Sequence, residues 1–259
     1  WGACLMGLGR KYEALQSFNI AIELKPDCLP AHFNRGLLFK SDNQFSEACI
    51  EFEEALKLKP TLAAALTGLL ECFAQLHRSQ DLLDLATTIL DENTLVDDFR
   101  PLFYRAFAHY RMGAYLRGID DAKKVFETYE QLPQPHQDRL ISILVQCYKE
   151  HGDMLSHQDE PQNALQYYEK ALEIVQAPQE ASAVLLSKAS ALHSSGDSEH
   201  SKELLLTCIQ AHPDQNKPFL EALGMLQLDL GQDLQEAKKN LVLGLSGELD
   251  PSKTDSLFI

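Results

Sequence analysis

The sequence predicts an all-α chain in which antiparallel helix pairs repeat along the protein. Three observations support this fold class. Prolines and small residues recur at steps of 34 residues, apolar side chains follow the 3.6-residue period of helices, and no segment alternates polar and apolar residues as a strand would. Because one helix pair cannot bury its apolar face alone, we expect each pair to pack against its neighbours.

The first two repeats carry the clearest pattern. Pro26 and Pro60 each close the string Ala-(Ile/Leu)-(Glu/Lys)-Leu-Lys-Pro, and they lie 34 residues apart. Polar turns at 9–11 and 41–43 separate the two helices of each repeat, and the proline stops the second helix. The same step of 34 relates Gly2 to Gly36, Ala14 to Ala48, Phe18 to Phe52 and Ala21 to Ala55.

Later repeats keep this spacing less strictly. Two small residues seven positions apart, with a large apolar residue between them, share one face of a helix and fit a close helix crossing. Matching positions are Gly118 and Val125, then Ala164, Tyr168 and Ala171, then Ser201, Leu205 and Cys208, and finally Ala237, Leu241 and Gly244.

The repeat near residues 63–98 has two alternative registers. The step of 34 places Leu70, Leu82 and Ile89 where small residues are expected, whereas a turn three residues shorter would place Ser79 and Ala86 in two of those positions. Residues 137–157 have helical periodicity throughout, so the first helix of that repeat is expected to be extended.

The repeats are therefore expected near 1–28, 29–62, 63–98, 99–134, 135–181, 182–217 and 218–246. We expect them to form one continuous array without domain boundaries. A polar tail follows at 247–259.

This pattern resembles the tetratricopeptide repeat family, and residues 27–60 match it best. The resemblance implies a right-handed α-solenoid whose first helices line a concave groove for an extended peptide or a partner helix. Carried onto this sequence, the groove positions are Asn34, Leu37 and Lys40 in the second repeat, and Arg100, Phe103, Tyr104, Phe107, Tyr110 and Arg111 in the fourth.

The fourth repeat is distinctive because four aromatic residues share a helix face with an arginine at each end. Aromatic residues and arginine are enriched in binding hot spots, and two fixed cations would favour a partner that carries carboxylates. The alternative is that some of these aromatics pack against the neighbouring helix.

Charge and composition restrict the classes of partner. The net charge of −15 argues against a nucleic acid as the main partner. The charge is unevenly distributed, because residues 101–157 are neutral between two acidic blocks. The groove of the fourth repeat could therefore be locally cationic, which is consistent with an acidic partner.

Cysteine usage and hydropathy give expectations about the compartment. Six cysteines are scattered singly, as expected for reduced thiols in the cytoplasm, and no apolar run is long enough to span a membrane. The chain begins with Trp1 and not Met, so we expect it to be part of a longer protein.

The search for catalytic and cofactor motifs is negative, so we expect a chain that is not an enzyme and binds no cofactor. The string Gly7-Leu-Gly9 has Tyr12 where a nucleotide-binding loop has its third glycine. Cys147 and His151 share a helix face, but two ligands do not make a metal site, and no metal is expected.

The function that follows is a scaffold for protein–protein interaction. One alternative is a regulatory region of a larger enzyme or multi-subunit complex, and another is self-association through the end repeats. Some family members act as co-chaperones by clamping the C-terminal carboxylate of heat-shock chaperones. A role of this kind is disfavoured for this chain. Asn34 matches that clamp, but Ala3, Ala64 and Gly68 occupy other clamp positions.

Overall fold

The computed structural model describes residues 1–129, 132–211, 216–232 and 234–245, and these residues form fourteen helices and no strand. The predicted fold class, an all-α solenoid of antiparallel helix pairs, is confirmed. The chain divides into two compact parts, an N-terminal part at Trp1–Gln134 and a C-terminal part at Pro135–Ile259. The single continuous array and the polar tail at 247–259 stay predictions, and the tail lies outside the described residues.

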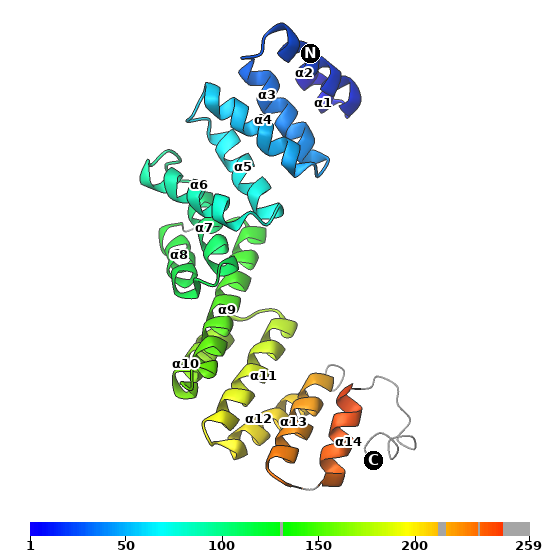
Figure 1. Cartoon of the computed structure of the whole chain (residues 1–259), viewed down its shortest axis with the longest axis vertical. Coiled ribbons are helices and arrows are strands. Elements are labelled where there is room, and N and C mark those ends of the chain that lie inside the picture. Colours follow the sequence, from blue (N-terminus) through cyan, green and yellow to red (C-terminus); the bar gives the residue numbers. More distant parts are fainter. Residues whose placement is uncertain (130–131, 212–215, 233, 246–259) are drawn as a thin grey trace. The chain divides into compact units, whose positions relative to one another are not determined.

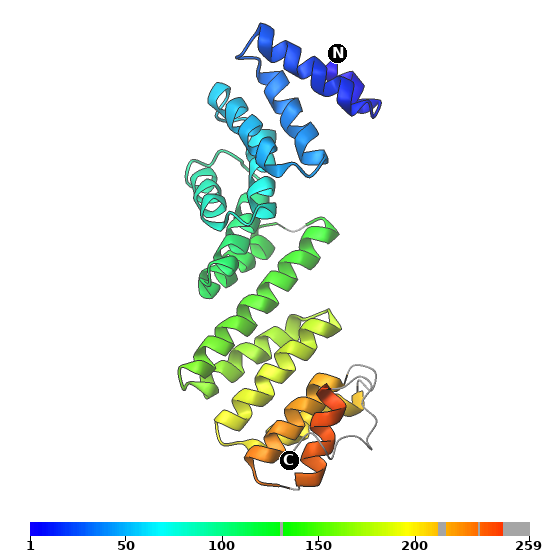
Figure 2. The ribbon, with the colours of Figure 1, turned by 45° about the vertical axis from the view of Figure 1, so that its right-hand side comes forward.

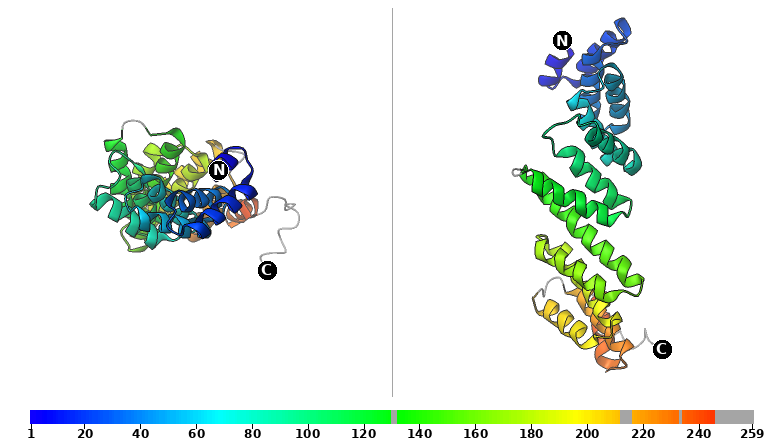
Figure 3. Two further views of the ribbon diagram at one scale, coloured as in Figure 1. Left: turned by 90° about the horizontal axis from the view of Figure 1, so that it is seen from above. Right: turned by 90° about the vertical axis from the view of Figure 1, so that its left-hand side faces the viewer.

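The N-terminal part contains four helix pairs, in which each helix packs against the next along the chain. Figures 1 and 3 show these pairs as successive antiparallel layers. The helices are α1 (Gly2–Gly7), α2 (Lys11–Leu24), α3 (Leu29–Ser41), α4 (Phe45–Leu58), α5 (Ala63–Gln75), α6 (Ser79–Asp91), α7 (Arg100–Arg111) and α8 (Tyr115–Thr128).

The C-terminal part contains three further pairs. Its first helix has 24 residues and is the long green helix of Figure 2, which confirms the extension expected from residues 137–157. None of the helices in the described ranges is long and apolar enough to cross a membrane. The helices are α9 (Gln134–His157), α10 (Pro161–Ile174), α11 (Pro178–Ser194), α12 (Ser198–Ala211), α13 (Lys217–Asp229) and α14 (Leu234–Leu245).

The repeated small and apolar positions form the core. Ala48, Phe52 and Ala55 on α4 are completely buried, and Ala164, Tyr168 and Ala171 on α10 occupy the same places in a later pair. Small residues allow the two helix axes to approach, and the large residue between them fills the space at the crossing. The sequence pattern thus corresponds to the packing in both parts.

Glycines of the first helices make room for these large residues. A methyl group on Gly36 would lie 2.9 Å from Cδ1 and Cε1 of Phe52, and one on Gly68 would lie 2.8 Å from the opposite edge of the same ring. Gly152 and Tyr168 repeat this arrangement, with a separation of 2.6 Å. Since carbon atoms pack optimally at about 3.5–4.0 Å, only glycine fits these positions without displacement.

The two helices of each pair are joined by a turn that contains one residue with a positive φ angle. The first three are Gly9, Asn43 and His77, with φ of 72°, 58° and 58°, at intervals of 34 residues. Glycine and asparagine adopt this left-handed conformation most readily, whereas histidine does so at a greater cost. The later pairs use Gly113, Asp159, Gly196 and Gly231.

The structure selects one register for residues 63–98. The three-residue link between α5 and α6 has the same length as the link between α3 and α4, so the turn is not shortened. Leu70, Leu82 and Ile89 are therefore buried at the positions where other repeats have small residues.

Candidate functional site

The aromatic face predicted on α7 divides into a buried and an exposed portion. Phe103 is 1% exposed and Tyr104 is 5% exposed, so both rings belong to the core. The Phe103 ring packs edge to face against Tyr104, at a centroid distance of 5.2 Å, and against Phe99, at 6.3 Å. Phe99 also packs against Tyr129 at the end of α8. These aromatics hold the link before α7 in place.

Phe107, Tyr110 and Arg111 form the accessible portion of the same helix face. Phe107 and Tyr110 are half-buried, and Arg111 is exposed. The Arg111 guanidinium lies 5.9 Å from the centre of the Phe107 ring, within range of a cation–π contact. We call these three residues the α7 patch.

Arg100, the cation at the other end of the predicted face, is held by a carboxylate of the preceding link. Its guanidinium donates to both oxygens of Asp98, and its backbone N–H donates to Oδ1 at 2.9 Å. Burial alone would raise the pKa of Asp98, but the bonds from the side chain and backbone of Arg100 hold that pKa below its ordinary value. Arg100 therefore acts first as a local structural contact.

The two predicted residues on α3 also have partners inside the protein. Lys40 Nζ lies 2.5 Å from a carboxylate oxygen of Glu71 on α5, and Asn34 donates to the Pro30 carbonyl at 2.7 Å. The Lys40 contact links the first helices of two consecutive pairs. An acidic ligand at Lys40 or Arg100 would therefore have to compete with an existing carboxylate.

Two ion pairs that the sequence analysis missed recur between the helices of a pair. Arg35 on α3 donates to Glu51 on α4 at 2.6 Å, and Arg105 on α7 donates to both oxygens of Asp121 on α8. Both pairs are separated by 16 residues, which is the spacing from Gly36 to Phe52. The sequence signal that could have predicted these ion pairs is an arginine followed by an acidic residue 16 positions later.

His32 completes the buried polar cluster around Glu51. Its Nδ1 lies 2.9 Å from Glu51 and its Nε2 lies 2.8 Å from the carbonyl oxygen of Pro26. The cluster ties the link before α3 to α3 and α4. These contacts are structural, since His32 and Glu51 are both buried.

Cys147 and His151 do not converge with other ligands. Cys147 is completely buried, and burial raises the pKa of its thiol to about 12. His151 packs edge to face on Tyr167 at 4.5 Å, and burial lowers its pKa. Among the described residues, no group of three or more His, Cys, Asp or Glu side chains is placed to hold a metal ion.

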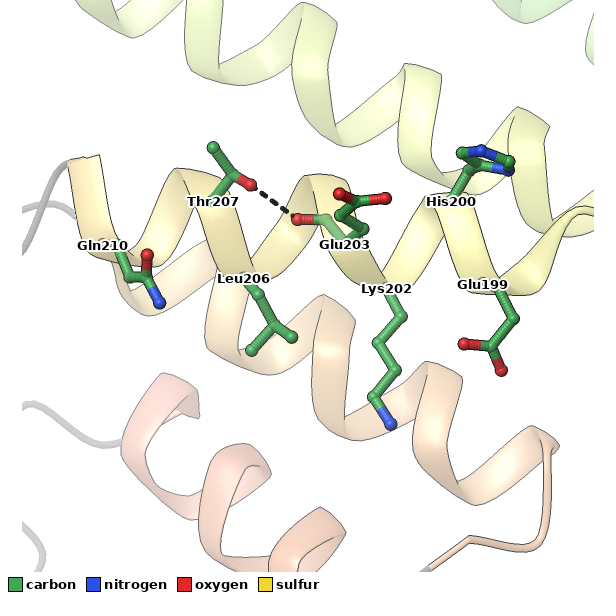
Figure 4. Close-up of a pocket in the computed structure, with 7 residues that line it drawn as sticks. All are labelled: Glu199, His200, Lys202, Glu203, Leu206, Thr207 and Gln210. Carbon is green, nitrogen blue, oxygen red and sulfur yellow. Dashed lines mark hydrogen bonds between the residues drawn. The ribbon is translucent and has the colours of Figure 1, made fainter.

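A hollow of about 440 Å³ runs along α12 in the C-terminal part. Its lining residues all belong to this one helix, as Figure 4 shows. The hollow mixes Glu199 and Glu203 with Lys202, and the Thr207 hydroxyl donates to the backbone of Glu203. Because every lining residue within the described ranges comes from α12, its groups do not converge on a common point.

The helix pairs and the α7 patch define the class of protein: a helix-repeat protein with accessible side chains on the first helix of a pair. A sequence profile of the tetratricopeptide repeat family matches residues 29–62, the second pair. Together with the helix-pair packing and the similarity to tetratricopeptide repeat structures, this match confirms the resemblance. Residues 29–62 match the tetratricopeptide repeat, and the helix pairs along the chain share the fold of tetratricopeptide repeat structures.

Solved structures share this fold at low sequence identity. The C-terminal part of a TPR repeat-containing protein from Cytophaga hutchinsonii is 15% identical, with a TM-score of 0.60 over 100% of this chain and 98% of that chain. YrrB, described as a TPR protein with an unusual peptide-binding site, is 17% identical, with a TM-score of 0.51 over 84% of this chain and 98% of its own.

A larger assembly also contains the fold. A chain in the structure of Naa15/Naa10 bound to HypK-THB is 16% identical and has a TM-score of 0.62 over 92% of this chain. This chain spans 35% of that chain's length. No curated protein sequence matched. At such identities, the similarity to solved structures defines the fold alone.

Proposed function

We propose that the chain is a protein-interaction scaffold that binds a peptide segment of a partner protein on the first helices of its N-terminal part. The observation that carries the proposal is the α7 patch, in which Phe107, Tyr110 and Arg111 stay accessible while the rest of the aromatic face is buried. Aromatic rings next to an arginine are the side chains that most often dominate binding energy in interfaces.

The patch is well suited to an extended or helical peptide. Phe107, Tyr110 and Arg111 occur at i, i+3 and i+4, so they project from one side of α7. Half-buried Phe99 packs against the buried ring of Phe103, which in turn packs against buried Tyr104. These contacts fix the start of α7 and hold the patch on a rigid element. Lys40 and Asn34 extend the proposed surface to α3.

An acidic segment is the partner we propose for this surface. Arg111 is exposed, and the surrounding block of residues 101–157 is neutral in a chain of net charge −15. Arg111 can therefore donate hydrogen bonds to a carboxylate beside the Phe107 ring, whereas Lys40 and Arg100 already contact carboxylates.

The test is selection of short peptides from a random display library on the whole chain, followed by affinity measurements with the double variant Phe107→Ala and Tyr110→Ala. We expect selected peptides enriched in Asp and Glu, and a loss of affinity of about tenfold or more in the double variant. Thermal unfolding of the variant serves as a check that it remains folded.

A matched control is Tyr12→Ala, which removes an exposed aromatic residue from α2 in the same part of the chain. We expect it to leave peptide affinity unchanged. If selected peptides bind the patch variant as tightly as the original protein, the proposed site is wrong. If no peptide is selected and light scattering shows a mass that grows with concentration, self-association replaces the proposal.

A further inference from the structure

Besides the hollow on α12, the protein has a cavity in its N-terminal part. This cavity lies between α6, α7 and α8, three consecutive helices visible in Figure 1. Its volume is about 470 Å³. Arg105 and His109, one helical turn apart on α7, line it together with Arg117 on α8 and Thr87 on α6. In contrast to the hollow on α12, this cavity brings polar side chains from three helices to one place.

Arg105 is fixed in position by a buried carboxylate. Its Nε and Nη2 donate to the two oxygens of Asp121, at 2.9 and 2.7 Å, and the Asp121 side chain is 6% exposed. A guanidinium has five N–H groups, so others remain to donate toward the cavity. Since Asp121 holds the plane of the guanidinium, little conformational freedom is lost when a ligand accepts these bonds.

Arg117 supplies the second guanidinium. Within the described residues, Arg117 forms neither a hydrogen bond nor a salt bridge. Both arginines influence the pKa of His109, which is buried. Burial lowers this pKa most, and the charges of Arg105 and Arg117 lower it further, whereas the charge of Asp121 raises it. The two cations thus act on the same small volume.

We propose that this cavity binds a glutamate or aspartate side chain of an acidic peptide segment from a partner protein. A carboxylate can accept two parallel N–H bonds from a guanidinium, and Thr87 on α6 adds a hydroxyl group to the lining. Asp84 also lines the cavity, and Asp121 lies beside it, so the two carboxylates balance the two arginines. Directional donors without a net positive charge favour a monoanion over a phosphate dianion.

This site is distinct from the α7 patch. Arg105 and His109 project from α7 on another side than Phe107, Tyr110 and Arg111, because each residue advances about 100° around a helix. The inference therefore does not depend on the proposed function, and the two sites can be tested separately on the same protein.

The test uses NMR of the arginine Nε–H groups in the whole chain. The probes are a capped peptide with two adjacent glutamates, the same peptide with two glutamines, and inorganic phosphate. We expect saturable shifts of the Arg105 and Arg117 signals with the glutamate peptide, and no saturable shifts with the glutamine peptide.

Arg117→Gln is the variant of choice, because Arg117 is exposed and its loss leaves the Arg105–Asp121 pair intact. We expect it to weaken binding of the glutamate peptide by about tenfold or more, as for a lost charge-assisted bond. Lys124→Gln makes the same charge change at another exposed position of α8, outside the cavity, and should change affinity by less than about twofold.

Three results would overturn the proposal. They are the absence of saturable shifts at Arg105 and Arg117, equal effects of the two variants, and tighter binding of phosphate than of the glutamate peptide. The variant Phe107→Ala with Tyr110→Ala should keep glutamate-peptide binding at the cavity. Loss of binding in that variant would mean that the peptide uses the α7 patch and not this cavity.

Discussion

Replacing Gly36 by alanine tests the packing rule that organises the repeats. The new methyl group would lie 2.9 Å from two carbons of the Phe52 ring, which is completely buried. The ring cannot retreat freely, because Gly68 on α5 packs closely against its opposite edge. Inserting a methyl group into a packed core costs about 1–3 kcal/mol, and because the ring is held at both edges we expect the upper part of that range, about 2–3 kcal/mol. Alanine recovers about 1 kcal/mol through its higher helix propensity.

The expected net effect is a loss of about 1–2 kcal/mol in the free energy of unfolding. Urea titrations followed by circular dichroism measure it. The decisive comparison is made in a Phe52→Leu background, where the obstructing ring edge is gone. There Gly36→Ala should be neutral or stabilising by up to about 1 kcal/mol.

Gly7→Ala is the control, because a methyl group there would meet no atom within 4 Å. It should not destabilise the protein. The packing argument is refuted if Gly36→Ala is as stable as the original protein, or if its effect is the same with and without Phe52.

Three further predictions concern the turns, the buried histidines and the thiols. His77→Gly relieves a positive φ of 58° and should raise the free energy of unfolding by about 0.5–1 kcal/mol, measured by urea titration; a decrease would contradict the strain argument. Burial lowers the pKa of His109 and His151, so the unfolded chain binds more protons than the folded chain as the pH falls through the ordinary histidine pKa of about 6.5, and the free energy of unfolding should decrease below that pH. His151→Gln should reduce this pH dependence, and an unchanged slope would exclude His151 as a source. Among the thiols, exposed Cys4 should react with a thiol reagent in the native protein, whereas Cys147, with its pKa raised to about 12, should react only after unfolding.

Local sequence patterns were sufficient to predict the repeated helix pairs. The spacing that relates Pro26 to Pro60 and Phe18 to Phe52 encodes helix length, turn position and crossing point together, since each repeat must bury the same face against its neighbours. The long first helix at residues 137–157 was predicted for the same reason, because helical periodicity is a property of the segment itself.

The register of residues 63–98 required the tertiary structure. Small residues at a crossing are a preference and not a necessity, so Leu82 and Ile89 could not be placed from the pattern alone. Only the packed neighbours show that the turn keeps its three-residue length and that the core accommodates the larger side chains.

The candidate site shows the same division. Sequence spacing placed Phe103, Phe107 and Tyr110 on one face of α7, but it did not distinguish the buried ring from the half-buried ones. It also identified Lys40 and Arg100 as cations without revealing their carboxylate partners. The sequence by itself determined the helix pairs, because helical period and repeat length are local. The tertiary structure decided exposure and charge pairing, because both depend on side chains that neighbouring helices contribute.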